Sequence, residues 1–166
     1  GEAYNKAFDW YKKAWDISNR TFGEEHPATA AICNGLGDVT LRGSKRDEAM
    51  KWFNKALKIR EKTLGKDHPD MAKTYGGIAS VYKAAGEPEP AIEWYKKSVD
   101  VLEKAFGGTH PVLVGTYESL ADVYLSKGDN IQAMMWLKKA LRINEKVHGP
   151  AHTDTAGDYK KIAWVY

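Results

Sequence analysis

The fold is decided by the stretch Ile59-Arg60-Glu61-Lys62-Thr63-Leu64-Gly65-Lys66-Asp67-His68-Pro69, because parts of it recur along the chain at a fixed interval. Its histidine recurs every 42 residues, at His26, His68, His110 and His152. Other columns with this period also hold one residue type throughout: Gly23, Gly65, Gly107 and Gly149; Ala7, Ala49, Ala91 and Ala133; Trp10, Trp52, Trp94 and Trp136; Lys13, Lys55, Lys97 and Lys139. A gapless repeat of this kind indicates an array of similar structural units.

Each unit is predicted to hold two amphipathic helices. Met71, Tyr75, Ile78 and Tyr82 form one apolar stripe of a first helix, and prolines such as Pro69 suit the first turn of such a helix. We expect no strand and helices at about 3–22, 27–42, 46–64, 69–85, 88–106, 111–127, 130–148 and 153–166. A two-helix hairpin cannot bury its stripe alone. The predicted fold is therefore all-α, an α-solenoid of stacked antiparallel helix hairpins.

We interpret residues 1–166 as a single repeat domain. A half repeat with only a second helix (1–25) precedes full repeats at 26–67, 68–109 and 110–151, and a half repeat with only a first helix (152–166) follows. The opening residues show neither an initiator methionine nor a signal peptide, so we expect a piece of a longer, cytoplasmic protein.

Composition excludes several classes of protein. Hydrophobic residues make up 43% and charged residues 28%, which is typical of a soluble folded domain. The net charge of +3 is too small to argue for nucleic-acid binding by itself. Cys33 is the sole cysteine, so no internal disulfide can form. No catalytic motif occurs, and we expect a protein that is not an enzyme and has no cofactor.

Two features carry a family resemblance. Leu36-Gly37 with Ala49, Phe53 and Ala56 resembles the tetratricopeptide repeat. The 42-residue period and the joint ending in His68-Pro69 resemble the kinesin light chain class of that repeat. The resemblance implies a right-handed superhelix, with first helices lining a concave groove that binds a peptide or helix of a partner protein.

The resemblance also implies where a partner would bind. The family's asparagine pair survives here only as Asn34, and the groove charges have mixed sign. We therefore expect a polar or mixed-charge ligand whose acidic part lies near Lys160 and Lys161. The expected binding residues are Asn34, Asp38, Arg42, Lys73, Gly76, Gly77, Ser80, Lys83, Glu118, Asp122, Lys160, Lys161 and Trp164.

The adjacent glycines Gly76 and Gly77 allow two interpretations, because glycine within a helix is unfavourable and needs a reason. Either a ligand backbone approaches there, or neighbouring helices pack tightly. On the first interpretation, Gly77→Trp should block binding and leave the fold intact.

The aromatic and histidine columns favour structural roles. The tryptophan column should pack in or near the core. The histidines that precede a proline, His26, His68 and His110, should bond locally at helix starts. No metal site is expected, since Gly149 and Pro150 break the helix between His148 and His152. Two other functions stay open beside partner binding: an array that self-associates end to end, and a helical RNA-binding repeat.

Overall fold

The computed structural model describes residues 2–166, with side chains from Tyr4 onward. This part of the chain contains eight α-helices, one 3-10 turn and no strand, as predicted. In chain order the elements are α1 (Glu2–Phe22), α2 (Pro27–Arg42), α3 (Arg46–Thr63), α4 (Met71–Ala85), α5 (Pro88–Phe106), η1 (Pro111–Leu113), α6 (Val114–Ser126), α7 (Asn130–His148) and α8 (Thr153–Val165). No helix among these residues is both long and apolar enough to span a bilayer.

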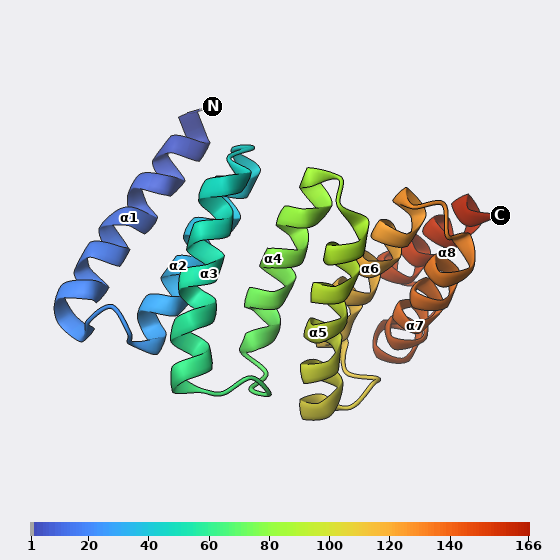
Figure 1. The fold of residues 1–166 in the computed structure, drawn as a ribbon. Helices are drawn as coiled ribbons and strands as arrows, with labels where there is room; N and C mark the ends of the chain where they lie inside the picture. The colour runs from blue at the N-terminus through green and yellow to red at the C-terminus, as the bar shows by residue number, and fades with distance from the viewer. Residues whose placement is uncertain (1) are drawn as a thin grey trace.

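The helices progress in chain order from the N-terminal end of the molecule to its C-terminal end, with α2 behind α3 and α8 behind α7 in this view (Figure 1). Contacts join α2 to α3, α4 to α5 and α6 to α7 as hairpins, and α1 and α8 pack on α2 and α7. Each repeat expected at 26–67, 68–109 and 110–151 encloses one of these hairpins. The predicted α-solenoid is therefore confirmed.

The histidine column acts at the starts of the first helices. The Nδ1 atoms of His26, His68, His110 and His152 each accept a hydrogen bond from the backbone N–H two residues later, at 3.2 Å in every case. Such bonds satisfy a donor that the first helical turn leaves free. The local role expected of His26, His68 and His110 is confirmed, and His152 plays the same role.

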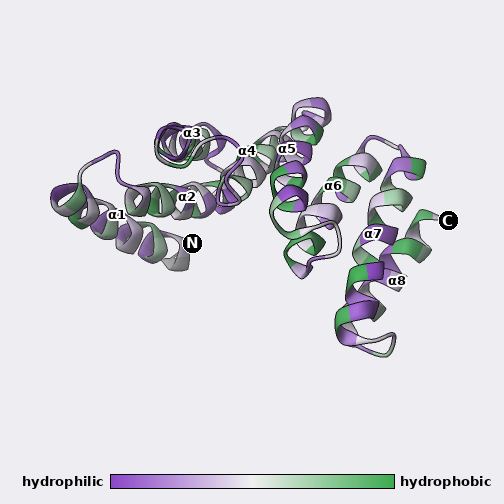
Figure 2. Cartoon of the chain, turned by 90° about the horizontal axis from the view of Figure 1, so that it is seen from below, coloured by the Kyte–Doolittle hydropathy of each residue, from purple (hydrophilic) through white to green (hydrophobic). Residues whose placement is uncertain are grey.

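The buried cores join consecutive hairpins, and each helix carries both polar and apolar residues (Figure 2). Phe53 of α3 is fully buried. A Cβ atom added to Gly77 of α4 would lie 2.3 Å from the Phe53 ring, and one added to Gly37 of α2 would lie 2.7 Å from it. Phe53 therefore holds α3 against the backbones of two neighbouring first helices.

The tryptophan column packs as predicted in all but its first member. Trp136 is buried and stacks at a tilt on Tyr117, with ring centroids 5.5 Å apart. Trp94 is half-buried and makes the same contact with Tyr75 at 5.5 Å. The prediction is wrong for Trp10, which is 69% exposed because no such tyrosine packs on it among the described residues.

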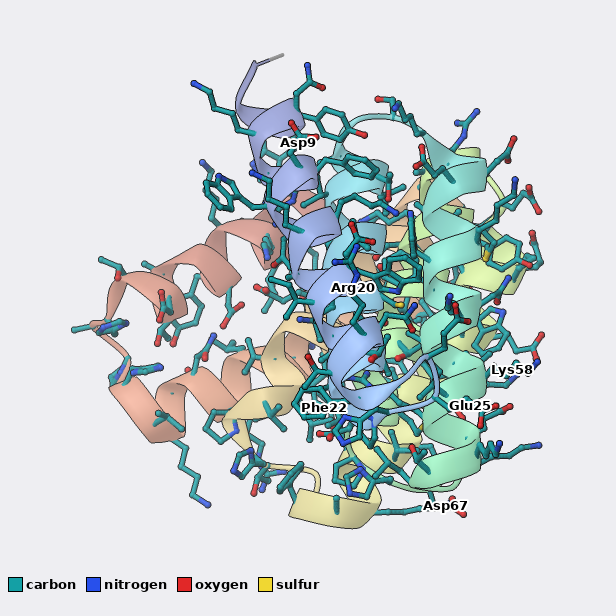
Figure 3. All side chains as sticks on the ribbon, turned by 90° about the vertical axis from the view of Figure 1, so that its left-hand side faces the viewer. Asp9, Arg20, Phe22, Glu25, Lys58 and Asp67 are labelled. Atoms are coloured by element: carbon teal, nitrogen blue, oxygen red, sulfur yellow. The ribbon has the colours of Figure 1, made fainter. Side chains whose placement is uncertain are left out.

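The first repeat replaces this tyrosine–tryptophan contact with another. Cys33 stands in the column of Tyr75 and Tyr117 and is fully buried, where burial raises the pKa of its thiol to about 11. The space is filled by Trp15 of α1, whose ring lies edge-on to Trp52 at 5.8 Å. Seen from the α1 end, charged side chains such as Lys58 of α3 point outward from the helices (Figure 3).

Candidate functional site

A hollow of about 470 Å³ lies over α4, between α2 and α6. We call it the central hollow. Five of the residues predicted from the resemblance line it: Asp38, Lys73, Gly76, Gly77 and Ser80. They come from α2 and α4, and α6 closes the far side with Gly115, Thr116 and Ser119.

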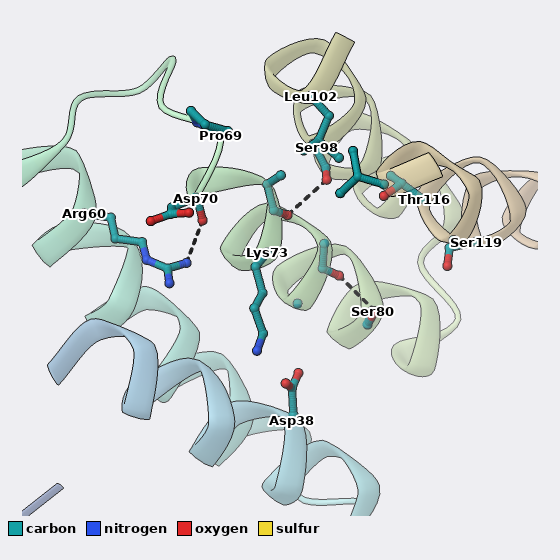
Figure 4. Close-up of a pocket in the computed structure, with 15 residues that line it drawn as sticks. Asp38, Arg60, Pro69, Asp70, Lys73, Ser80, Ser98, Leu102, Thr116 and Ser119 are labelled. Carbon is teal, nitrogen blue, oxygen red and sulfur yellow. Dashed lines mark hydrogen bonds between the residues drawn. The ribbon is translucent and has the colours of Figure 1, made fainter. Parts of the chain in front are cut away.

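The wall of the central hollow contains the carboxyl group of Asp38, which forms no ion pair with a basic side chain among the described residues. The side chains of Asp38 and Lys73 point toward one another across the hollow (Figure 4). Among the described residues, no hydrogen bond or ion pair within 4.0 Å reaches the Asp38 carboxylate. Burial raises the pKa of Asp38, and the positive charges of Lys73 and Arg42 act against that rise. A half-buried carboxyl of this kind favours a ligand that donates hydrogen bonds.

Gly76 leaves the floor of the central hollow open. A Cβ atom added to it would meet only the Oγ of Ser98, at 4.0 Å, and one added to Gly115 would meet nothing within 4 Å. A ligand can thus approach the helix backbone closely at both positions.

Gly77 differs from its neighbour, although both border the hollow. It is buried, and the ring of Phe53 occupies the space where a side chain would go. The expectation that Gly77→Trp would leave the fold intact is therefore wrong, because the new side chain would collide with Phe53. For Gly77, tight helix packing is the correct interpretation.

Asn34 departs from its expected place facing the groove. It is fully buried, and its Nδ2 donates to the Oγ1 of Thr74 at 3.1 Å, across the contact between α2 and α4. The buried guanidinium of Arg60 donates to the same hydroxyl at 2.8 Å and to the carbonyl of Asp70 at 2.7 Å. Asn34 thus satisfies a buried polar network beneath the central hollow.

Ser80 is also committed to internal bonds. Its Oγ donates to the carbonyl of Gly76 at 2.9 Å and lies 2.8 Å from the hydroxyl of Tyr95. Ser80 therefore lines the hollow with a hydroxyl group that is already hydrogen-bonded within the protein.

Four of the predicted groove charges pair with one another. Lys83 of α4 contacts Asp122 of α6 at 2.9 Å. Lys161 of α8 forms an ion pair with Glu118 of α6. These pairs link successive first helices and leave Lys160 as the exposed cation of the lysine pair.

A second hollow of about 400 Å³ lies between α6 and α8. We call it the terminal hollow; it is lined by Leu125, Gly157, Lys160, Lys161 and Trp164. Trp164 is 82% exposed and gives this hollow an aromatic wall. The predicted residues therefore divide between two hollows, with Lys83, Glu118 and Asp122 on the helices between them, and exposed Arg42 lines neither.

The sequence did not assign several lining residues to the site. They include Arg60, Ser98, Leu102, Val112 and Thr116, which come from second helices, the η1 turn and the start of α6. No sequence signal pointed to Thr116, whereas its neighbours Gly115 and Ser119 stand 42 residues after Lys73 and Gly77, which the sequence did assign to the site.

Comparisons with known proteins agree with this architecture. Family models described as tetratricopeptide repeat match residues 2–62, 41–104 and 113–154. No curated protein matches the chain.

Solved structures share the fold. Two crystal structures of a putative kinesin light chain with nearly identical TPR-like repeats, from Podosopora anserina, superpose with TM-scores of 0.81 and 0.80. Both are 23% identical to this chain over 98% of it and 77% of their own length. BtubC (BKLC) from P. vanneervenii superposes with a TM-score of 0.85 at 20% identity, covering 99% of this chain and 65% of its own.

Proposed function

This chain belongs to the tetratricopeptide repeat family, and we propose that it is a scaffold module that binds a peptide or helix of a partner protein in the central hollow. Repeats of this family are generally non-catalytic scaffolds for protein interactions. The observation that carries the proposal is the open backbone floor at Gly76 and Gly115, beside the poorly neutralised carboxyl of Asp38.

The lining of the two hollows favours a ligand of particular chemistry. In the central hollow, the carboxylate of Asp38 would accept hydrogen bonds from the ligand, and the amine of Lys73 would donate one to it. An extended peptide backbone or the polar face of a helix offers both kinds of group. A ligand that continues into the terminal hollow meets Trp164 and the exposed amine of Lys160. An apolar side chain next to an acidic group fits there.

Filling the floor of the central hollow tests this proposal. Gly76→Trp should weaken binding of partner peptides at least about tenfold, which corresponds to ~1.4 kcal/mol, because the indole occupies the ligand's place. Peptides are first selected on the parent protein from a phage-displayed random library. Their affinities for parent and variant are then measured by fluorescence anisotropy.

The matched control is Ala105→Trp, which adds the same side chain at an exposed position of α5 outside both hollows. It should bind the selected peptides as the parent does, and both variants should keep the parent's helical circular dichroism. Peptides that bind Gly76→Trp with parental affinity would place the binding site elsewhere.

A second candidate function, end-to-end association of copies, is favoured by the register of two exposed rings. Tyr75 contacts Trp94, and Tyr117 contacts Trp136, each pair 19 residues apart. Tyr159 and Trp10 belong to the same two columns, are 44% and 69% exposed, and make no such contact among the described residues. Docking α8 of one copy on α1 of another would form this pair between copies.

Sedimentation velocity across a concentration series tests this association. The parent's average mass should rise with concentration, and Trp10→Ala should stay monomeric because the interface ring is gone. Trp164→Ala is the control, since Trp164 is more exposed but outside the pairing column. A parent protein that remains monomeric at the highest concentration excludes this second function.

The RNA-binding alternative gains no similar support. Lysines of the second helices pair with acidic neighbours, as in Lys55 with Glu24, Lys97 with Glu93, and Lys139 with Glu103. This pattern is typical of a solvated outer face.

A further inference from the structure

The joint between α7 and α8 gathers three side chains that can ligate a metal. His148 is the last residue of α7, His152 caps α8, and Asp154 lies in its first turn. Gly149 adopts a φ of 87°, a left-handed value that turns the chain back on itself. The two imidazoles consequently stack with centroids 4.6 Å apart. The sequence-based argument that the helix break separates these histidines is wrong for this reason.

We propose that His148, His152 and Asp154 form a binding site for a divalent transition-metal ion such as Zn²⁺. The Oδ2 of Asp154 lies 3.7 Å from the Nε2 of His148 and 3.5 Å from the Nδ1 of His152. One ligand atom from each of the three residues lies within 4.8 Å of the others. Bonds of about 2.0–2.2 Å to a tetrahedral ion place ligand atoms roughly 3.3 Å apart. The side chains are exposed, so they can close the remaining distance by rotation.

The donor set and the helix ends suit such an ion. Two imidazoles and one carboxylate match the preferences of Zn²⁺, Co²⁺, Ni²⁺ and Cu²⁺, and water completes the coordination. The negative end of α7 attracts a cation, and Asp154 offsets the positive end of α8.

Metal binding can leave the joint itself intact. If the Nδ1 of His152 becomes a ligand, it gives up its 3.2 Å hydrogen bond from the N–H of Asp154. Thr155 still donates to the carbonyl of Gly149 at 2.8 Å, and Ala156 N–H still donates to the carbonyl of His152 at 2.9 Å.

The other joints of the chain show what stacking alone requires. Phe22 stacks on His26 at 4.7 Å, and Phe106 stacks on His110 at 4.9 Å. At the position equivalent to His148, phenylalanine therefore provides the same ring stacking on the cap histidine. Asp70 also stands two residues after the cap His68, but Leu64 takes the place of His148 there. Only the joint of α7 and α8 combines a second imidazole with such a carboxylate. The metal ligands at this joint are therefore additional to the helix-capping role that the four histidines share.

Calorimetric titration of the full chain with Zn²⁺ tests the site. The parent should bind one ion per chain. His148→Phe keeps the ring contact seen at the other joints and removes one ligand. Its affinity should fall at least about tenfold, since even outer-shell changes at metal sites cause losses of that size.

His110→Asn provides the matched control. It removes a cap histidine outside the cluster, and asparagine is itself a good helix cap. This variant should bind Zn²⁺ as the parent does.

Thermal melting with and without Zn²⁺ supplies a second measurement. An ion that binds the folded state should raise the parent's melting temperature, whereas His148→Phe should show no such rise and should melt like the parent in metal-free buffer. The site is excluded if the parent binds neither Zn²⁺ nor Co²⁺. It is equally excluded if His148→Phe retains parental affinity, or if His110→Asn loses as much as His148→Phe.

Discussion

Replacing Phe53 by alanine should lower the free energy of unfolding by about 3–5 kcal/mol, which is usual when a buried aromatic ring is truncated. Phe53 is fully buried, and its ring lies directly against the backbones at Gly37 and Gly77. Its loss leaves a cavity at the point where α3 meets α2 and α4. Urea denaturation followed by circular dichroism at the helical band measures the change.

Phe22→Ala is the control for this experiment. The Phe22 ring on α1 is 57% exposed and touches His26 at 4.7 Å. Its removal should lower the free energy of unfolding by about 1 kcal/mol or less. Equal losses in the two variants would contradict the role of Phe53 as the contact between repeats.

The architecture could be predicted from the sequence because its signals are local. A histidine that caps a helix and a glycine with positive φ act within a few residues of their own position, so the repeated columns locate the helix ends. The differences between the predicted and the observed helix starts are small and local as well. The start of α6 is delayed to Val114 because Pro111–Leu113 form a 3-10 turn, and α4 begins at Met71 instead of residue 69.

The candidate site could be predicted only in part, because groove residues depend on what packs behind them. The family resemblance implies that Asn34 and Gly77 face the groove, but it does not show which side chain of this chain lies opposite each of them. Thr74 bonds to Asn34, and Phe53 covers Gly77. The ion pairs of Lys83 and Lys161 could not be predicted from the sequence either, because they depend on the rotamers of long side chains.

One signal for the glycines was nevertheless present in the sequence. Tyr11 precedes Gly35 by 24 residues, and Phe53 precedes Gly77 by the same 24 residues. In both pairs the aromatic ring fills the space beside the glycine, within 2.3 Å of where a Cβ atom would lie. An aromatic residue and a glycine at this fixed offset therefore predict contact between a second helix and the following first helix.

This contact predicts opposite effects of alanine at two adjacent positions. Gly77→Ala should lower the free energy of unfolding by about 1–3 kcal/mol, because its Cβ overlaps a buried ring that has little room to move. Gly76→Ala should raise it by about 0.5–1 kcal/mol, because its Cβ enters open space and alanine favours the helix. The two variants differ only in position, so urea denaturation of both gives a matched comparison.

Shortening the opposing ring identifies the cause of the Gly77 effect. In a Phe53→Leu background the ring edge beside Gly77 is absent, so Gly77→Ala should become less destabilising by at least about 1 kcal/mol. Gly76→Ala should have the same effect in both backgrounds, because its Cβ does not approach Phe53. If Gly77→Ala is equally destabilising in both backgrounds, its effect comes from the helix backbone, and the aromatic–glycine contact does not explain why α4 carries a glycine there.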